Sequence, residues 1–114
     1  MNEKQKDTLE NLKQELRRGS IALVAMSQLQ TAQYGYAMIR SLTEKGFEVG
    51  QDTLYPLLRR LENQGLLESE WRVEDPRPRR YYQLSQSGRE VLKNLSAEWK
   101  KQEKTIRRII NESE

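Results

Sequence analysis

The chain has no cysteine and no histidine among its 114 residues. Without cysteine there are no disulfides and no thiol chemistry. Without histidine the commonest general base and the commonest metal ligand are both missing, which leaves carboxylates, lysines and tyrosines for catalysis. The sequence also has no glycine-rich phosphate loop and no metal-ligand spacing. We therefore expect no enzyme, no cofactor and no metal site.

Long apolar runs are absent as well. No window approaches the length of a transmembrane helix, and the first residues are too polar for a secretory signal. Hydrophobic residues make up 35% and charged residues 32% of the chain, with a net charge of +3. This composition is typical of a small helical protein, or of one completed by a partner chain. We expect one domain in the cytoplasm without membrane contact; the charge favours a polyanionic partner but also fits an ordinary basic protein.

The N-terminal third predicts two helices. Residues 3–17 place charged side chains around one apolar stripe, which consists of Leu9, Leu12 and Leu16. Gly19 is expected to end this helix, and Ser20 is expected to cap the next one. That second helix, residues 21–30, is apolar on nearly every side through Met26, so we expect it at the buried centre of the domain.

Two further helices are predicted in the middle of the chain. Residues 34–46 carry an apolar stripe and end at a glycine, and residues 47–49 offer a short strand at best. Residues 51–65 have leucines at helical spacing and end at a glycine, although Pro56 lies among them. Proline lacks a backbone donor and crowds the carbonyl four residues back. We expect Pro56 just past the first turn, where tightening or bending limits the lost bonding.

The periodicity then changes from helix to strand and back. Residues 66–73 and 79–85 alternate apolar and polar side chains, which predicts two antiparallel strands joined by a basic loop over residues 74–80. A long last helix is predicted from Ser85 or Ser87 to about Ile110. Its apolar positions follow the spacing of a coiled-coil seam and are Leu92, Leu95, Trp99, Ile106 and Ile109.

The two middle helices fit a helix-turn-helix, with residues 51–65 as the recognition helix. Hydrogen-bonding side chains gather at its start, where base edges would be read; they are Gln51, Asp52, Thr53 and Tyr55. The alternative is that Gly50 and Asp52 simply cap a helix.

The basic loop after the recognition helix predicts the wing of a winged helix. Arg77, Arg79 and Arg80 follow one another among prolines there, and guanidinium groups suit phosphates and the minor groove. The alternative is a solvated loop in which Arg80 pairs with Glu68 or Glu70.

Three motifs in order resemble the PadR family of bacterial transcriptional regulators, in its short-tailed branch. They are YGYAM at 34–38, TLYPLLRRLENQGLLES at 53–69 and RRYYQLSQSGREVL at 79–92. The resemblance covers nearly the whole chain. It implies a mainly α fold with a two- to three-stranded antiparallel sheet, made of a winged helix-turn-helix over residues 1–86 and a dimerisation helix over 87–114. It also implies a homodimeric repressor on a pseudo-palindromic operator.

The resemblance further assigns roles to single residues. Tyr36 and Arg59 are expected at phosphates, and Pro56 is expected to aim Thr53 and Tyr55 at DNA. Residues 50–52 depart from the family, which often has serine or threonine, proline and glycine there, so base preference is the least transferable property. The stripes over Leu9 to Leu16 and Leu92 to Ile109 are expected to pair across a two-fold axis.

The role of Trp99 stays open between two alternatives. It is either a core anchor of the dimer or part of a pocket for a small planar or phenolic effector. Trp71 is expected to be structural, and Tyr81 and Tyr82 are expected on opposite faces of their strand, one packed and one available to DNA. The alternative function is a winged-helix module that binds a protein and not DNA; an acidic partner surface would favour it.

Overall fold

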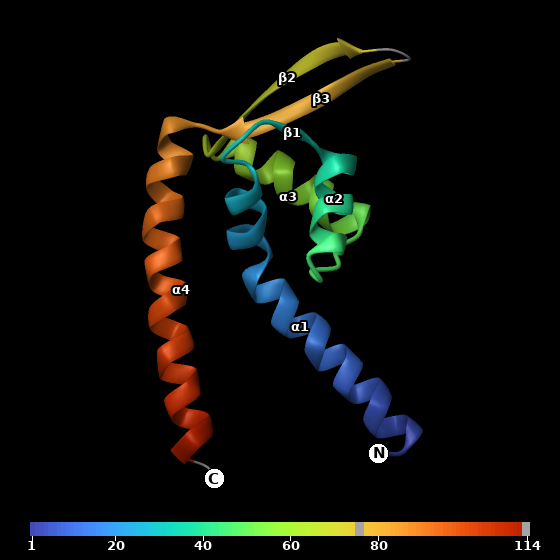
Figure 1. The fold of residues 1–114 in the computed structure, drawn as a ribbon, viewed down its shortest axis with the longest axis vertical. Coiled ribbons are helices and arrows are strands. Elements are labelled where there is room, and N and C mark those ends of the chain that lie inside the picture. The colour runs from blue at the N-terminus through green and yellow to red at the C-terminus, as the bar shows by residue number, and fades with distance from the viewer. Residues whose placement is uncertain (75–76, 113–114) are drawn as a thin grey trace.

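Four helices and a three-stranded antiparallel sheet form the part of the chain that the computed structural model describes, residues 1–74 and 77–112 (Figure 1). The elements in order are α1 (Glu3–Gln28), β1 (Gln33–Tyr34), α2 (Gly35–Glu44), α3 (Gln51–Asn63), β2 (Leu67–Glu74), β3 (Arg77–Leu84) and α4 (Gln86–Glu112). The sheet has the order β1-β3-β2. The predicted fold class, mainly helical with a small antiparallel sheet and a long last helix, is confirmed.

The N-terminal third forms one helix, so the predicted break at Gly19 and cap at Ser20 were wrong. α1 continues for 26 residues, and the Ser20 Oγ donates to the Arg17 carbonyl one turn back, 3.2 Å away. A glycine inside a helix costs about 1 kcal/mol relative to alanine. Burying one large apolar side chain contributes about 1.5–3 kcal/mol, so the buried end of α1 at Ala25 and Met26 outweighs the cost.

The strand that joins the β2–β3 hairpin is β1, which comes first in the chain. The strand considered for residues 47–49 does not form. Gln33 and Tyr34 pair with Tyr82 and Tyr81 of β3. The Phe47 amide instead donates to the Leu42 carbonyl at 2.8 Å, which closes the end of α2 and leaves residues 47–49 irregular.

The second wing strand starts earlier than predicted, so Arg77 lies in a strand and not in the loop, while Arg79 and Arg80 lie in a strand as the alternation predicts. β2 and β3 pair from Leu67↔Leu84 to Glu74↔Arg77, so all three arginines belong to β3. Cross-strand backbone hydrogen bonds therefore fix them, in place of a loop stiffened by proline. Two loop residues of the prediction, Asp75 and Pro76, lie outside the described residues.

The core lies where the end of α1, α2, α3, the base of the sheet and the start of α4 meet (Figure 1). Its fully buried large side chains are Met26, Leu29, Met38, Leu54 and Leu58. The apolar segment that was expected to be buried as a whole is buried only towards its end, because residues 21–24 pack against the core with part of their surface exposed.

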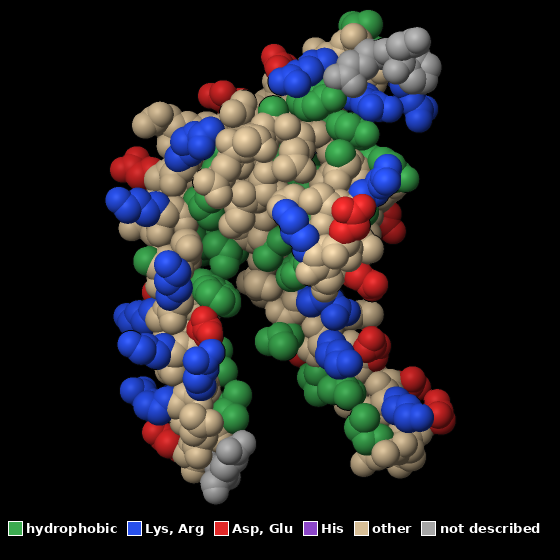
Figure 2. Space-filling model, viewed as in Figure 1, with side chains coloured by type: hydrophobic (Ala, Val, Ile, Leu, Met, Phe, Trp, Pro, Cys, Tyr) green, Lys and Arg blue, Asp and Glu red, His purple; other side chains and the backbone are tan. Residues whose placement is uncertain are grey.

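The first half of α1 and the second half of α4 extend away from the core as two separate legs (Figure 1). Ser85 starts α4 as predicted, since its Oγ accepts from the Gly88 amide at 2.9 Å and donates to the Gly65 carbonyl at 2.6 Å. In Figure 2, hydrophobic side chains line the facing sides of the two legs. Apolar surface of this kind on a small chain marks an interaction site.

Candidate nucleic-acid interface

A short irregular segment joins α2 to α3. Gly46 has φ of 90°, a left-handed conformation that suits glycine. Its amide donates to the Thr43 carbonyl at 3.0 Å. This turn brings the chain to Gly50, from which α3 starts with its apolar side already directed to the core.

α3 has one buried and one exposed side. The buried residues are Leu54, Leu57, Leu58 and Leu61, and the exposed ones include Gln51, Asp52, Thr53, Pro56 and Arg59. Helical geometry of about 100° per residue places Asp52, Pro56 and Arg59 near the middle of the exposed side. Four of the five α3 residues that we predicted at DNA are therefore exposed.

Pro56 lies on this exposed side, just past the first turn as predicted. The Thr53 and Leu54 amides both donate to the Gly50 carbonyl, at 3.2 and 3.0 Å, so the first turn is tightened. The bond that Pro56 lacks would end on the Asp52 carbonyl. Because both residues are exposed, water can hydrate that carbonyl, and the proline costs α3 little.

The fifth predicted residue of α3, Tyr55, is half-buried beside α2. A Cβ built on Gly35 would lie 2.1 Å from the Tyr55 Cε1, so the ring covers the start of α2 where no side chain intervenes. Tyr36, the predicted phosphate contact, is exposed in the first turn of α2.

Arg80 connects the wing to α3. Its Nη2 lies 2.7 Å from the Glu62 Oε1, and its Nε donates to the Ser69 Oγ at 3.0 Å. The Ser69 Oγ in turn donates to the other carboxylate oxygen of Glu62. Neither of the two partners considered in the sequence, Glu68 or Glu70, pairs with Arg80; Glu70 pairs with Arg72 at 2.9 Å.

The opposite face of the sheet carries a row of alternating arginines and tyrosines. The Arg79 guanidinium lies 4.5 Å from the Tyr34 ring centroid, and the Arg72 guanidinium lies 4.1 Å from that of Tyr81. The two rings meet edge to face, 5.5 Å apart. These distances are typical of cation–π and aromatic pairs, so Arg79 is held against β1 while Arg77 is exposed further out.

Tyr81 and Tyr82 lie on opposite faces, as predicted, and Tyr82 is the buried one. Burial raises the pKa of the Tyr82 phenol above 10.0, and the nearby Arg80 charge opposes part of this rise. Trp71, expected to be structural, is 66% exposed. That expectation was wrong, because β2 extends past the end of the core and no described element covers the ring.

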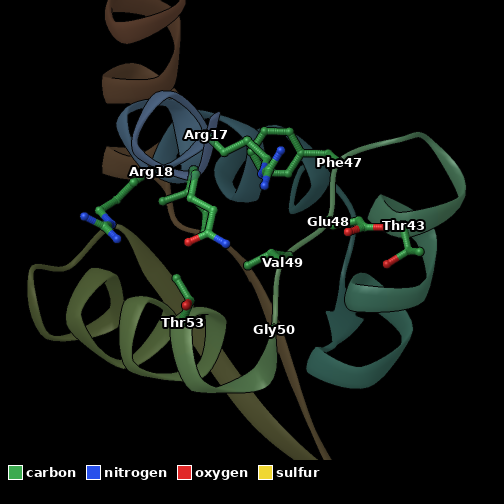
Figure 3. A pocket seen from close by; sticks show the side chains of 10 residues that line it. Arg17, Arg18, Thr43, Phe47, Glu48, Val49, Gly50 and Thr53 are labelled. Atoms are coloured by element: carbon green, nitrogen blue, oxygen red, sulfur yellow. The ribbon is translucent and has the colours of Figure 1, made fainter. Parts of the chain in front are cut away.

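A groove of about 500 Å³ borders the start of α3 (Figure 3). Arg17 and Arg18 of α1 line it together with Gly50 and Thr53. Sequence reasoning missed both arginines, since neighbouring basic residues on a helix reveal nothing about which distant helix they approach. They add positive charge beside the recognition helix.

The predicted dimerisation residues divide into two groups. Leu92 is buried in the core of the single chain. The others are partly or largely exposed along the legs: Leu9, Leu12, Leu16, Leu95, Trp99, Ile106 and Ile109. Leu16 is 77% exposed. Trp99 lines a groove of about 490 Å³ between α1 and α4 and a groove of about 520 Å³ that α2 and Phe47 also border. There is therefore space beside it for either role considered.

Within the described residues, no group of three or more acidic side chains is arranged to hold a metal ion. The helices among these residues also include none with the length and apolar character needed to cross a bilayer.

A helix-turn-helix followed by a hairpin whose second strand carries arginines defines a winged-helix nucleic-acid-binding protein. A family model, that of the transcriptional regulator PadR-like family, matches residues 23–94. The chain belongs to this family, and it is therefore a DNA-binding transcriptional regulator and not an enzyme.

Solved structures and a curated relative agree with this assignment. A PadR family transcriptional regulator from Eggerthella lenta superposes with a TM-score of 0.91 at 38% identity, over 96% of this chain and 97% of that one. A PadR-like transcription factor from Bacteroides fragilis has a TM-score of 0.72 at 37% identity, over 87% and 98%. Transcriptional regulator Rv3488 of Mycobacterium tuberculosis is 46% identical over 59 residues, which is 52% of this chain and 55% of that protein. The match thus covers about half of the mycobacterial relative.

Proposed function

We propose that the protein is a homodimeric repressor that binds a pseudo-palindromic operator in the bacterial cytoplasm. The observation that carries this proposal is the polar exposed side of α3 next to a wing with arginines. Gln51, Asp52 and Thr53 would read base edges in the major groove. Tyr36, Arg59 and Arg77 would bind phosphates, which adds affinity without sequence choice.

Dimerisation would use the apolar sides of the two legs. An isologous dimer covers the same patch on both copies, so one stripe on each leg is enough to form a symmetric interface. Residues 1–86 would then bind DNA, and residues 87–114 would set the distance between two recognition helices. A spacing of about one helical turn of DNA, roughly 34 Å, matches two half-sites.

An effector would act at this same interface. Trp99 lines a groove between α1 and α4 and a second groove that α2 and Phe47 also border, and an indole offers a flat apolar surface to a small planar or phenolic molecule. A ligand that binds one spacing of the recognition helices better than another shifts the dimer towards that spacing and releases the operator.

The experiment is binding to duplexes that tile the region upstream of the gene, titrated with salt and competed with unrelated DNA. Tight binding that survives the competitor is expected. Arg77→Ala should weaken binding and reduce the slope of log K against log salt by about 0.9 for each phosphate that is no longer neutralised. The matched control is Arg108→Ala, at the far end of α4, which should leave the DNA affinity and the salt slope unchanged. Binding equal to that of random DNA would favour a winged helix that binds a protein partner.

A further inference from the structure

The long helix α4 gathers its positive charges on one side. At about 100° per residue, its basic residues fall within an arc of about 120°, and this arc lies roughly 150° around the helix from the apolar stripe. Only Glu90 of the four glutamates of α4 lies within the same arc. Figure 2 shows Lys and Arg side chains along the outer side of the α4 leg. We call this side the basic stripe; it consists of Arg89, Lys93, Lys100, Lys101, Lys104, Arg107 and Arg108.

The lysines of the basic stripe have no anionic partner among the described residues. Lys93, Lys100 and Lys104 are exposed, whereas the carboxylates near the end of α4 pair with Arg107 and Arg108. Lys100, Lys104 and Arg108 also repeat a positive charge every four residues, a spacing that destabilises a helix. A local cost that the described part of the chain does not offset is typical of a functional surface.

Three of these lysines form a row along the helix. Lys93, Lys100 and Lys104 are seven and four residues apart, so they lie within about 40° of one another around the axis and about 10.5 and 6 Å apart along it. A surface depression of about 480 Å³ lies at the outer part of this row. Its lining residues are Lys100, Lys101, Glu103, Lys104 and Arg107. Because Glu103 pairs with Arg107, the lysines leave an excess of positive charge there.

The residue types of the basic stripe select among polyanions. Its arc contains no aromatic side chain, although single-stranded nucleic acid is bound largely by stacking on aromatic rings. It also contains no large apolar side chain of the kind that a membrane-surface helix inserts beside its cations. A DNA duplex is a stiff rod with one charge per about 1.7 Å of its length, and lysines alone can bind it. The stripe therefore fits duplex DNA best.

The basic stripe lies apart from the recognition helix. α4 packs against α1 and β3. In Figure 1, α4 forms one edge of the molecule, and α1 lies between its leg and α2. DNA in contact with the stripe is therefore expected to be a different segment from the one that α3 reads.

We propose that the basic stripe binds the phosphates of a second segment of duplex DNA, so that a protein bound to its operator bridges two segments. This inference rests on the proposed operator binding and adds a surface that takes DNA of any sequence, because phosphate contacts carry no base information. A protein held on DNA by α3 also meets other segments of the same molecule at high local concentration. Few contacts at the stripe are then enough to join them.

The test is a bridging assay with the full chain. An upstream duplex that binds the protein is fixed on beads, the protein is added, and unbound protein is washed away. A labelled duplex of unrelated sequence is then added, and the fraction that the beads retain is measured at several salt concentrations. Affinity for the upstream duplex is measured separately, by the anisotropy of a labelled copy in solution.

Two triple variants with the same change in net charge are compared. The first replaces the lysine row of α4: Lys93→Gln, Lys100→Gln and Lys104→Gln. The matched control replaces three exposed lysines of α1: Lys4→Gln, Lys6→Gln and Lys13→Gln. Glutamine is about as good a helix former as lysine, so both helices should stay folded, and circular dichroism checks this.

The unaltered chain is expected to retain the unrelated duplex at low salt and to release it as the salt concentration rises. The α4 variant should lower retention roughly tenfold or more, because three phosphates are no longer neutralised. Its affinity for the upstream duplex should stay unchanged. The α1 variant should retain as much unrelated duplex as the unaltered chain.

Three outcomes would overturn this inference and leave the proposed function intact. The first is an unaltered chain that binds the upstream duplex and retains no second one, and the second is equal retention by the two variants. The third is an α4 variant with weakened affinity for the upstream duplex itself, which would place the stripe on the same segment as α3.

Two further outcomes would also overturn it. Labelled poly-glutamate or vesicles with anionic lipid, retained in place of the unrelated duplex, would assign the stripe to an acidic protein or to a membrane surface. If no upstream duplex binds better than random DNA, the proposed function fails, and this inference fails with it.

Discussion

Arg80 of β3 and Glu62 of α3 are joined by an ion pair with the Nη2 2.7 Å from the Oε1, and Ser69 bonds to both side chains. The pair connects the wing to the recognition helix near the end of that helix. The angle between the two DNA-binding elements is therefore set by side chains and not by the backbone alone.

Arg80→Ala is expected to lower the free energy of unfolding by about 1 kcal/mol, because the partly buried Glu62 loses its cation. Urea unfolding measures this. Arg77→Ala, an exposed arginine of the same strand, is the matched control and should stay within about 0.5 kcal/mol of the unaltered chain. Unchanged stability of Arg80→Ala with weakened DNA binding would instead make Arg80 a direct DNA contact, as the sequence predicts.

Gly35→Ala is expected to displace the Tyr55 ring, since the new Cβ would lie 2.1 Å from the Cε1. Thermal unfolding should show a loss of stability, and DNA binding should weaken with it. Gly19→Ala is the control, because nothing lies within 4 Å of a Cβ there. It should stabilise α1 by about 0.5–1 kcal/mol. Equal effects of the two changes would contradict the close approach of Tyr55.

Pro56→Ala is expected to change operator affinity more than folding. Alanine restores the amide that can donate to the Asp52 carbonyl, so α3 should keep or gain stability. The tightened first turn would relax at the same time, which moves the side chains at the start of α3. Circular dichroism on heating and a binding titration separate the two effects. Wild-type affinity for every upstream duplex would contradict the role given to this proline.

Ile106→Asp is expected to dissociate the proposed dimer while each chain stays folded, because Ile106 is exposed in the single chain. A buried unpaired carboxylate at an apolar interface costs several kcal/mol. Sedimentation analysis would detect the monomer. Lys101→Gln makes the same change in net charge on another side of α4 and should leave the mass unchanged. A mass that responds equally to both variants would exclude this stripe as the interface.

Tyr82→Phe is expected to change the response to alkali. The raised pKa of Tyr82 means that the native state holds the phenolic proton more tightly than the unfolded chain does. This contribution to stability is complete below pH 10 and is lost as the pH rises from the unfolded pKa through the folded one. The free energy of unfolding, measured with urea above pH 10, should therefore fall less steeply with pH for Tyr82→Phe than for the unaltered chain. Identical slopes for the two proteins would contradict the burial of this phenol.

Much of the fold was predictable because it follows from local signals. Helix ends at Gly46, the cap at Ser85 and the alternation of the strands each depend on neighbouring residues. Gly19 misled because its helix penalty is local, whereas the burial that outweighs it comes from distant elements. The two-residue strand β1 is too short to have a period.

The candidate site was less predictable for the same reason. The residue types at the start of α3 and in β3 could be identified from the sequence. The partner of Arg80 could not, since Glu62 is 18 residues away and is brought near by the turn at Gly65 and the pairing of the strands. Trp71 was misread because an aromatic in an alternating strand is usually covered, and the length by which β2 outreaches the core is a property of the whole fold.

Because α1 is continuous, the direction of its exposed leucine stripe is fixed relative to its buried side. Leu9, Leu12 and Leu16 lie roughly a third of a turn around the helix axis from Ala25 and Met26. The single helix α1 thus turns one side to the core and another side to the proposed partner chain. Each residue added or removed between the exposed leucines and the buried end of α1 would rotate the exposed side by about 100° relative to the buried side. The number of residues between the two sides of α1 therefore determines how the partner chain of the proposed dimer is oriented relative to the recognition helices.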